Sequence, residues 1–436
     1  MNKIAKDTML LTFVNLFLQA LGLLLNIYIT KTLGSTNVGI VTLIATFYYL
    51  SAVLAGGNIF ICTNRLVSVE LANNGNPQKI FSYAVIFCLS LSFTVTGMIF
   101  VFSDEIALNL IKIPQALWAI RILALSLPIG TLSNCVKGYF QAHRNILLPS
   151  MIDCVSFLIR IAVIVMLIQF CVIMRGMSIF LAFALSVTIS TSAECILIVI
   201  AFCKQNVHCD KKVTINFKTF MAIAIPIALN SYIIASLSSA NDALIPLTLK
   251  QFGESTGDAL SKFGIFEAIV LPTLFFPSVI VQCLSCILLP EISKASASGN
   301  TVRVQHLTKK ALQRTLYFSM LIMVILLCFG NKIGMMLSDE KIAGEVITIL
   351  SPVIPLIYLE IVLEGILRGL GKYSFSTFNY IAEYIVRISV LLICVPLFGF
   401  YGLVISYILS NVVGNVSRIR NIDKIINVKF REVLFA

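Results

Sequence analysis

The chain has 436 residues, of which 58% are hydrophobic and only 12% are charged. Soluble domains carry about 25% charged residues, so this composition excludes an ordinary soluble enzyme or binding domain. The formal net charge of +12 alone would be compatible with nucleic-acid binding. The hydrophobicity, and the positions of the basic residues described below, favour an integral membrane protein instead.

Apolar stretches recur along the whole chain. Each is long enough to cross about 30 Å of hydrocarbon as an α-helix. The first stretch follows only MNKIAKD and shows no small-residue cleavage site, so we interpret it as a retained helix rather than a signal peptide. We therefore predict an all-α polytopic membrane protein with twelve helices, near residues 8–30, 38–63, 81–102, 116–141, 150–174, 178–203, 218–247, 260–290, 311–330, 343–367, 374–398 and 400–417.

The lysines and arginines are distributed unevenly between the two sides of this topology. Allowing for uncertain helix ends, 22 of the 32 basic residues lie at the termini and junctions of one side and seven lie in the opposite loops; the other three are Arg121, Arg160 and Arg387. Cytoplasmic loops of membrane proteins carry the excess of lysine and arginine. We therefore predict that both termini are cytoplasmic, and we interpret the net charge as a topology signal.

The sequence is similar to itself at an offset of 227 residues. IRIAVIV then aligns with VRISVLL, which places Arg160 on Arg387, and Gly138 aligns with Gly365. Six helices in each copy give both copies the same orientation. We therefore predict a parallel repeat about an axis along the membrane normal, with two six-helix lobes around a central cavity.

Nearer the start of each copy the offset shrinks, as one longer loop in the second copy would require. NNGN at 73–76 then pairs with ASGN at 297–300. The predicted division is an amino-terminal lobe at 1–203, a cytoplasmic linker at 204–217, a carboxyl-terminal lobe at 218–417 and a basic cytoplasmic tail at 418–436.

Polar side chains form a stripe on the first predicted helix and on the seventh. Asn15, Gln19 and Asn26 recur on one face of an otherwise apolar stretch. Asn230 and Asn241 have the same spacing in the seventh stretch as Asn15 and Asn26 have in the first. Because polar groups that face lipid are costly, we predict that these five residues line a substrate cavity. Helix packing through polar side chains is the alternative.

Ionisable residues within the stretches are the other candidates, because intramembrane charge is rare and marks functional or paired groups. Asp242 and Glu267, on the seventh and eighth helices, are candidates for a proton- or cation-coupling site. Glu383 and Arg387 are four residues apart with the acid first, which favours an ion pair along one helix.

Arg160 has no acid four residues away. Its candidate partners are Asp153, seven residues earlier in the same stretch, and an acid on another helix, for which Glu194 is the candidate. Attraction of an anionic substrate is the open alternative for Arg160. Arg65, at the cytoplasmic end of the second helix, could meet an anionic head group or serve as a positive-inside anchor.

The segment from residue 240 to residue 300 resembles the stage V sporulation protein B group of the multidrug/oligosaccharidyl-lipid/polysaccharide exporter superfamily. Its marks are LIP in the seventh stretch, GIFEAIVLP and FPS in the eighth, and LLPEIS followed by GN. In the first half, GGNIFICTNRLVSVELANNGN is similar to the family's second helix and the loop after it. Twelve helices fit the polysaccharide transporter branch.

The resemblance implies two six-helix lobes around a central cavity and flippases that move undecaprenyl-pyrophosphate-linked sugars across the bacterial cytoplasmic membrane. We therefore expect a flippase for a lipid-linked oligosaccharide or cell-wall precursor, working by alternating access as a monomer among membrane lipids. A proton- or cation-coupled multidrug exporter and a non-transporting membrane scaffold are the alternatives. Without a P-loop or HExxH motif, we expect no enzyme, no cofactor, no metal and no nucleic-acid partner.

Overall fold

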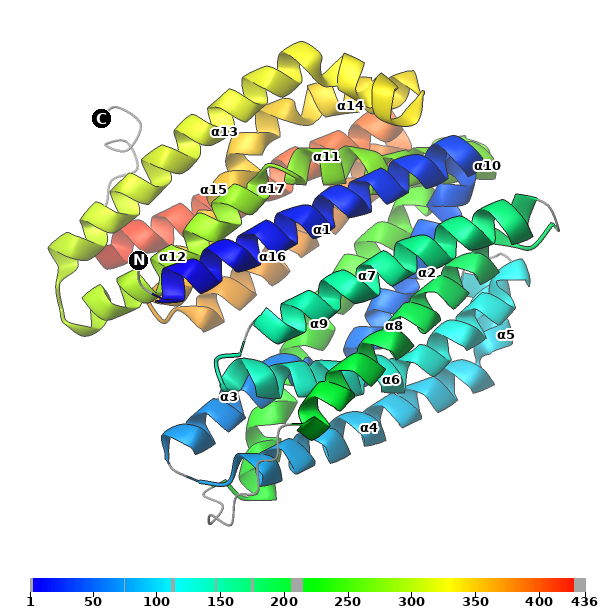
Figure 1. The fold of residues 1–436 in the computed structure, drawn as a ribbon. Coiled ribbons are helices and arrows are strands. Elements are labelled where there is room, and N and C mark those ends of the chain that lie inside the picture. Colours follow the sequence, from blue (N-terminus) through cyan, green and yellow to red (C-terminus); the bar gives the residue numbers. More distant parts are fainter. Residues whose placement is uncertain are drawn as a thin grey trace. The chain divides into compact units, whose positions relative to one another are not determined.

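The computed structural model (Figure 1) describes residues 3–73, 75–110, 114–145, 147–173, 176–204 and 215–426. Within these ranges all regular structure is helical, and twelve spans are long and apolar enough to cross a membrane. The predicted all-α, twelve-helix class is confirmed. Most of the predicted linker at 204–217 and the end of the predicted tail at 418–436 lie outside the described residues.

The helices follow the predicted stretches, but several of them are longer or are broken into shorter pieces. In chain order they are α1 (Lys3–Leu33), α2 (Ser35–Gly56), α3 (Ile59–Ala72), α4 (Pro77–Val101), α5 (Ser103–Glu105), η1 (Ile106–Leu110), η2 (Pro114–Ala116), α6 (Leu117–Ala142), α7 (Leu147–Leu167), η3 (Ile168–Ile173), α8 (Ile179–Lys204), α9 (Phe217–Gln251), α10 (Thr256–Ile265), η4 (Phe266–Val270), α11 (Leu271–Phe275), α12 (Ser278–Ala297), α13 (Thr301–Ser338), α14 (Lys341–Leu350), η5 (Ser351–Val353), α15 (Ile354–Gly369), α16 (Tyr373–Phe398) and α17 (Phe400–Ile426).

The eighth predicted helix, at 260–290, is interrupted. It consists of α10, the π-helical turn η4, α11 and α12. Pro272 lies in the first turn of α11 and Pro277 precedes α12. Because proline has no backbone N–H and its ring clashes with the preceding turn, a continuous helix is disfavoured here. Glu267 lies in the π-helical turn η4 that precedes these prolines, and such turns are frequent at functional sites.

Contacts divide the chain into two compact units. Unit 1 consists of Met1–Thr42 and Ala240–Ala436, and unit 2 consists of Leu43–Ser239. The units differ from the lobes predicted from the repeat. Helix α1 contacts α12 and η4 within unit 1, whereas residues 217–239 of α9 lie in unit 2. The lobe boundaries therefore stay a prediction. By their contacts, the first helix of each sequence copy belongs wholly or largely with helices of the other copy.

Glycines and aromatic rings explain this grouping. A Cβ atom on Gly39 would lie 1.9 Å from the carbonyl oxygen of Leu260, and one on Gly264 would lie 2.5 Å from the backbone nitrogen of Gly39. Only glycine allows such a close approach of two backbones. In unit 2, the ring of Phe220 on α9 packs edge-on against Tyr83 of α4, with centroids 6.2 Å apart.

Equivalent positions of the two sequence copies have equivalent structural roles. Asn76 caps the amino terminus of α4 and Asn300 caps that of α13, each by accepting backbone N–H donors with its side chain. Gly138 brings α6 against the backbone of α3, and Gly365 brings α15 against α12. These matched pairs support the predicted internal repeat.

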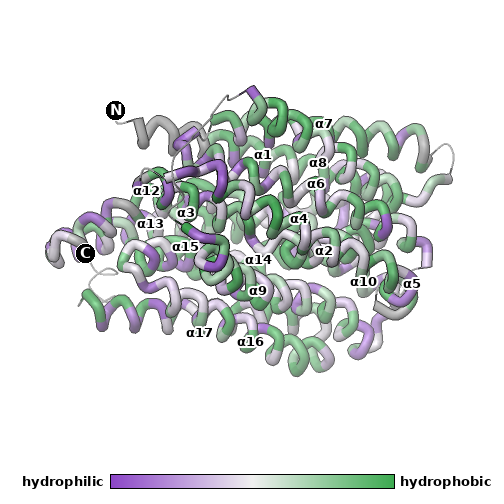
Figure 2. Tube along the Cα trace, turned by 90° about the horizontal axis from the view of Figure 1, so that it is seen from below, coloured by the Kyte–Doolittle hydropathy of each residue, from purple (hydrophilic) through white to green (hydrophobic). Residues whose placement is uncertain are grey.

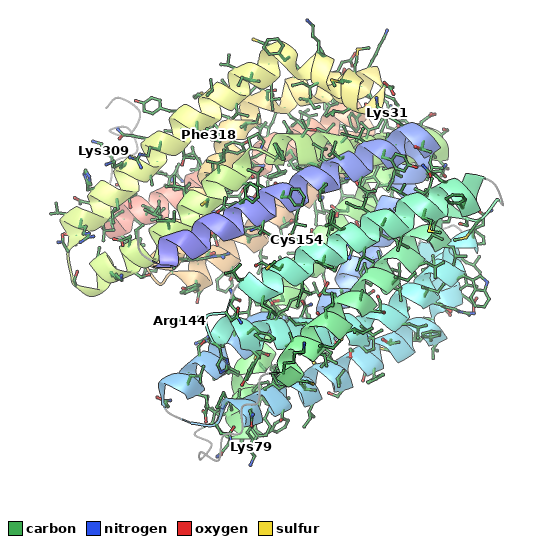
Figure 3. The ribbon with its side chains drawn as sticks, in the orientation of Figure 1. Lys31, Lys79, Arg144, Cys154, Lys309 and Phe318 are labelled. Carbon is green, nitrogen blue, oxygen red and sulfur yellow. The ribbon has the colours of Figure 1, made fainter. Side chains whose placement is uncertain are left out.

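The hydropathy of the helices agrees with a membrane-spanning fold. Figure 2 shows long hydrophobic stretches along the helices and hydrophilic stretches at many of their ends. In Figure 3, Lys31 and Lys309 lie at opposite ends of unit 1, and Lys79 and Arg144 lie toward the same end of unit 2. Within each unit, this matches the sides to which the charge distribution assigns these residues.

Candidate functional site

The two arginines aligned by the repeat make the same contact. The Nε atom of Arg160 on α7 donates to Ser190 Oγ on α8 at 3.1 Å. The Nε atom of Arg387 on α16 donates to Ser410 Oγ on α17 at 3.0 Å. Each serine in turn donates to the carbonyl oxygen three residues earlier in its own helix. The arginines therefore join equivalent pairs of neighbouring helices, one pair in each unit.

Arg387 lies in the more highly charged of the two environments. Its Nη2 atom forms an ion pair with Glu383 Oε1 at 3.1 Å, which confirms the pair predicted along one helix. Its guanidinium lies over the Tyr407 ring at 4.4 Å and over the Tyr384 ring at 5.2 Å. Aromatic faces stabilise a cation that is removed from water, so both the charge and the plane of this guanidinium are held in place.

Arg418 connects three carboxylates of unit 1. Its side chain is completely buried, and it lies 2.9 Å from Glu360, 3.1 Å from Glu383 and 3.7 Å from Glu364. From the sequence, Arg418 is expected in the cytoplasmic tail, after a twelfth helix that ends at residue 417. That helix end is wrong: α17 continues to Ile426, so Arg418 lies inside the helix bundle, where three glutamates compensate its charge.

Glycine makes room for this ion-pair cluster. A Cβ atom at Gly414 would lie 2.5 Å from Glu383 Oε2 and 2.9 Å from Arg418 Nη1. Glu364 also pairs with Arg368 at 3.0 Å, and Ser376 donates a hydrogen bond to it. The cluster balances three acids against three arginines, namely Glu360, Glu364 and Glu383 against Arg368, Arg387 and Arg418.

Glu267 adds a carboxylate to this balanced cluster. The charged side chains that interact with it electrostatically are Asp242 and Arg387. Asp242, on α9, accepts a hydrogen bond from Asn241 Nδ2 at 3.1 Å, and Asn241 is 2% exposed. Arg387 is also paired with Glu383, so its charge is shared between that carboxylate and Glu267. Carboxylates in apolar surroundings need a proton or a cation to compensate their charge.

Unit 2 holds a smaller cluster around Lys137. Its Nζ atom lies 2.5 Å from Asp153 and 2.6 Å from Glu194, and Ser133 donates to Glu194 at 2.6 Å. The expected ion pair between Arg160 and Glu194 is not among the contacts of the described residues; Arg160 interacts with Glu194 only at longer range. Lys137, which the topology assigned to a cytoplasmic junction, is the closer partner because it reaches both acids.

The polar residues predicted to line a cavity have different environments. Asn26 donates to the carbonyl oxygen of Ala268 in η4 at 3.0 Å, so it joins α1 to the turn that carries Glu267. Asn15 and Gln19 on α1 and Arg65 on α3 are exposed. Asn230, on α9, is half-buried. Participation of these residues in substrate binding stays a prediction.

The comparisons with known proteins point to one superfamily. Residues 257–393 match the family model described as MatE. The chain is 21% identical to "Stage V sporulation protein B" of Bacillus subtilis (strain 168), over 98% of this chain and 85% of that protein. The resemblance to the exporter superfamily is confirmed.

Solved structures of this superfamily share the fold. "Lipid II flippase MurJ, inward closed conformation" superposes with a TM-score of 0.74 at 14% identity, over 95% of this chain and 87% of that chain. A structure of the MATE multidrug transporter DinF-BH gives a TM-score of 0.72 at 15% identity, over 100% of this chain and 97% of that chain. The protein is therefore a multi-pass membrane protein with a MATE-like fold.

The MatE match covers much of the charged cluster. It includes Glu267, the two glutamates of α15, Glu383 and Arg387, whereas Asp242 and Arg418 lie outside it. Sequence reasoning missed Arg418 and Lys137, although one signal was available: the intramembrane acids outnumbered the predicted intramembrane bases.

Proposed function

We propose that this protein is a flippase that moves a lipid-linked oligosaccharide or cell-wall precursor of the undecaprenyl-pyrophosphate type across the bacterial cytoplasmic membrane by alternating access. The similarity to stage V sporulation protein B over nearly the whole chain carries the proposal. The fold shared with a lipid II flippase supports it. In this proposal the protein works as a monomer, with both termini in the cytoplasm.

Polar groups on different helices take different parts of the substrate. Arg65, exposed on α3, is the proposed first contact for the anionic head group, because a guanidinium can bind phosphate oxygens in a bidentate manner. Asn15 and Gln19, exposed on α1, are proposed contacts for saccharide hydroxyl groups. Asn230 and Asn241 of α9 are the proposed counterparts from the second copy.

Glu267 is the proposed coupling residue, with Asp242 beside it. Uptake of a proton or small cation at Glu267 would make the charge of this group more positive, and release would reverse the change. Arg387 would experience each change, because it interacts with both Glu267 and Glu383. Since Arg387 also joins α16 to α17 through Ser410, a change at Glu267 can alter how these helices pack.

A second candidate is a proton- or cation-coupled multidrug exporter. The fold shared with a MATE multidrug transporter favours it, and it would use the same coupling group. The two candidates differ in cargo and agree on Glu267.

Complementation separates them. The chain would be expressed in bacteria depleted of their resident lipid II flippase, with growth, precursor accumulation and drug resistance measured. Restored growth of wild type and of Glu345→Gln, an exposed acid on α14, but not of Glu267→Gln, supports a coupled flippase. Drug resistance without restored growth supports the exporter.

A further inference from the structure

A groove lies on unit 1, on the faces of α16 and α17. Its volume is about 530 Å³. None of its side chains belongs to the charged cluster around Arg418 or to the polar residues assigned to the substrate. Its lining includes Val412, Val413, Val416, Arg420, Asn421 and Lys424.

The lining changes character along α17. Val412 and Val416 mark the apolar end, and Arg420 and Lys424 mark the basic end. These four residues are spaced four apart, so they lie on one side of the helix. At 1.5 Å per residue the stripe extends for about 18 Å, which is close to the depth of one lipid leaflet of about 15 Å plus part of its head group.

The basic end is accessible and carries charge that the fold does not use. Arg420 and Lys424 are exposed, and within residues 215–426 neither forms an ion pair. Arg418, two residues earlier, is buried and already forms ion pairs with three glutamates. Asn421 lies between Arg420 and Lys424 in the sequence and also lines the groove.

We propose that this groove binds an anionic glycerophospholipid of the cytoplasmic leaflet. The lipid phosphate accepts hydrogen bonds from Arg420 and Lys424. An acyl chain lies along Val413 and Val416. Basic pockets on the cytoplasmic side of helix bundles are suited to anionic head groups.

The two ends of the groove together select this ligand. A free phosphate compound would satisfy the basic end and leave the valines exposed. A neutral zwitterionic lipid would cover the valines but bring no net negative charge to the two cations. This lipid site is separate from the proposed binding site of the transported cargo, because it contains neither Arg65 nor the coupling residues Glu267 and Asp242.

Lipid binding to the purified full-length protein tests the proposal. The protein in detergent would be titrated with phosphatidylglycerol, phosphatidylcholine or glycerol phosphate, and bound lipid counted by native mass spectrometry. We expect phosphatidylglycerol to bind more tightly than phosphatidylcholine. The double variant Arg420→Gln, Lys424→Gln should weaken phosphatidylglycerol binding about 30-fold. Each basic residue near an anionic surface raises the affinity about fivefold, and the variant removes two of them.

Two further variants complete the test. Lys310→Gln with Arg314→Gln removes the same charge from exposed positions of α13 and should leave the affinity unchanged. Val416→Trp fills the apolar end and should lower lipid binding with both cations intact. Equal binding of the two lipids, equal losses in both double variants, or displacement of the lipid by glycerol phosphate would overturn the proposal.

Discussion

Replacement of Arg418 by methionine is the most informative single change in the charged cluster. The substitution keeps much of the side-chain volume but removes a fully buried guanidinium that lies within 4.0 Å of three glutamates. Removal of one partner from a buried ion pair costs about 3–5 kcal/mol, since the other charge stays buried without compensation. The equilibrium constant for unfolding should therefore rise about 100- to 5,000-fold.

Thermal unfolding in detergent, followed by size-exclusion chromatography with fluorescence detection, measures this loss. Arg314→Met is the matched control, because Arg314 is exposed on α13 and the same charge is removed. Addition of Glu360→Gln to Arg418→Met should recover part of the loss by removing one of the carboxylates left without compensation. Equal melting temperatures for Arg418→Met and Arg314→Met would refute the interpretation of Arg418 as the centre of the cluster.

Three other substitutions test the remaining contacts. Lys137→Met should destabilise the protein by about 3–5 kcal/mol, because the two acids that it bridges in unit 2 lose their cation; a melting temperature equal to wild type would contradict this. Ser410→Ala should cost about 1.5–3 kcal/mol through one lost hydrogen bond to a charged group, and thermal unfolding should show a smaller loss than for Arg418→Met. Gly414→Leu should lower the yield of folded protein, because a side chain there displaces a buried ion pair; an unchanged yield would show that the cluster can move aside.

The helix content could be predicted because it depends on patterns that are local in sequence, and the repeat could be predicted because the sequence is similar to itself at a fixed offset. Apolar stretches of sufficient length identify the spans. The ion pair between Glu383 and Arg387 was also predictable, since its partners lie one helical turn apart. The match between Arg160 and Arg387 in sequence corresponds to identical contacts with Ser190 and Ser410.

The partners of the other buried charges could not be predicted because they lie on different helices. Arg418 follows the last apolar residues of its stretch, so its position in the sequence resembles that of an exposed cytoplasmic residue. Lys137 lies near the end of its apolar stretch, so its position in the sequence also resembles that of an exposed cytoplasmic residue. Whether such a residue is buried depends on the acids that face it from neighbouring helices, and the sequence contains no direct record of that packing.

The break in the eighth helix was only partly visible in the sequence. Pro272 and Pro277 are helix-breaking residues, but nothing local indicates that the preceding turn becomes π-helical at Glu267. The contact of Asn26 with Ala268 in that turn shows the role of tertiary structure, because α1 contributes a donor from far away in the chain.

Transport in proteoliposomes tests the central claim most directly. A fluorescent undecaprenyl-pyrophosphate-linked saccharide would be placed in one leaflet, and its appearance in the other leaflet followed with and without an imposed proton or sodium gradient. We predict that the wild-type protein and Glu345→Gln accelerate this movement and respond to one of the gradients, whereas Glu267→Gln does not respond. Movement no faster than in protein-free vesicles, together with gradient-driven transport of a cationic drug, would contradict the flippase assignment.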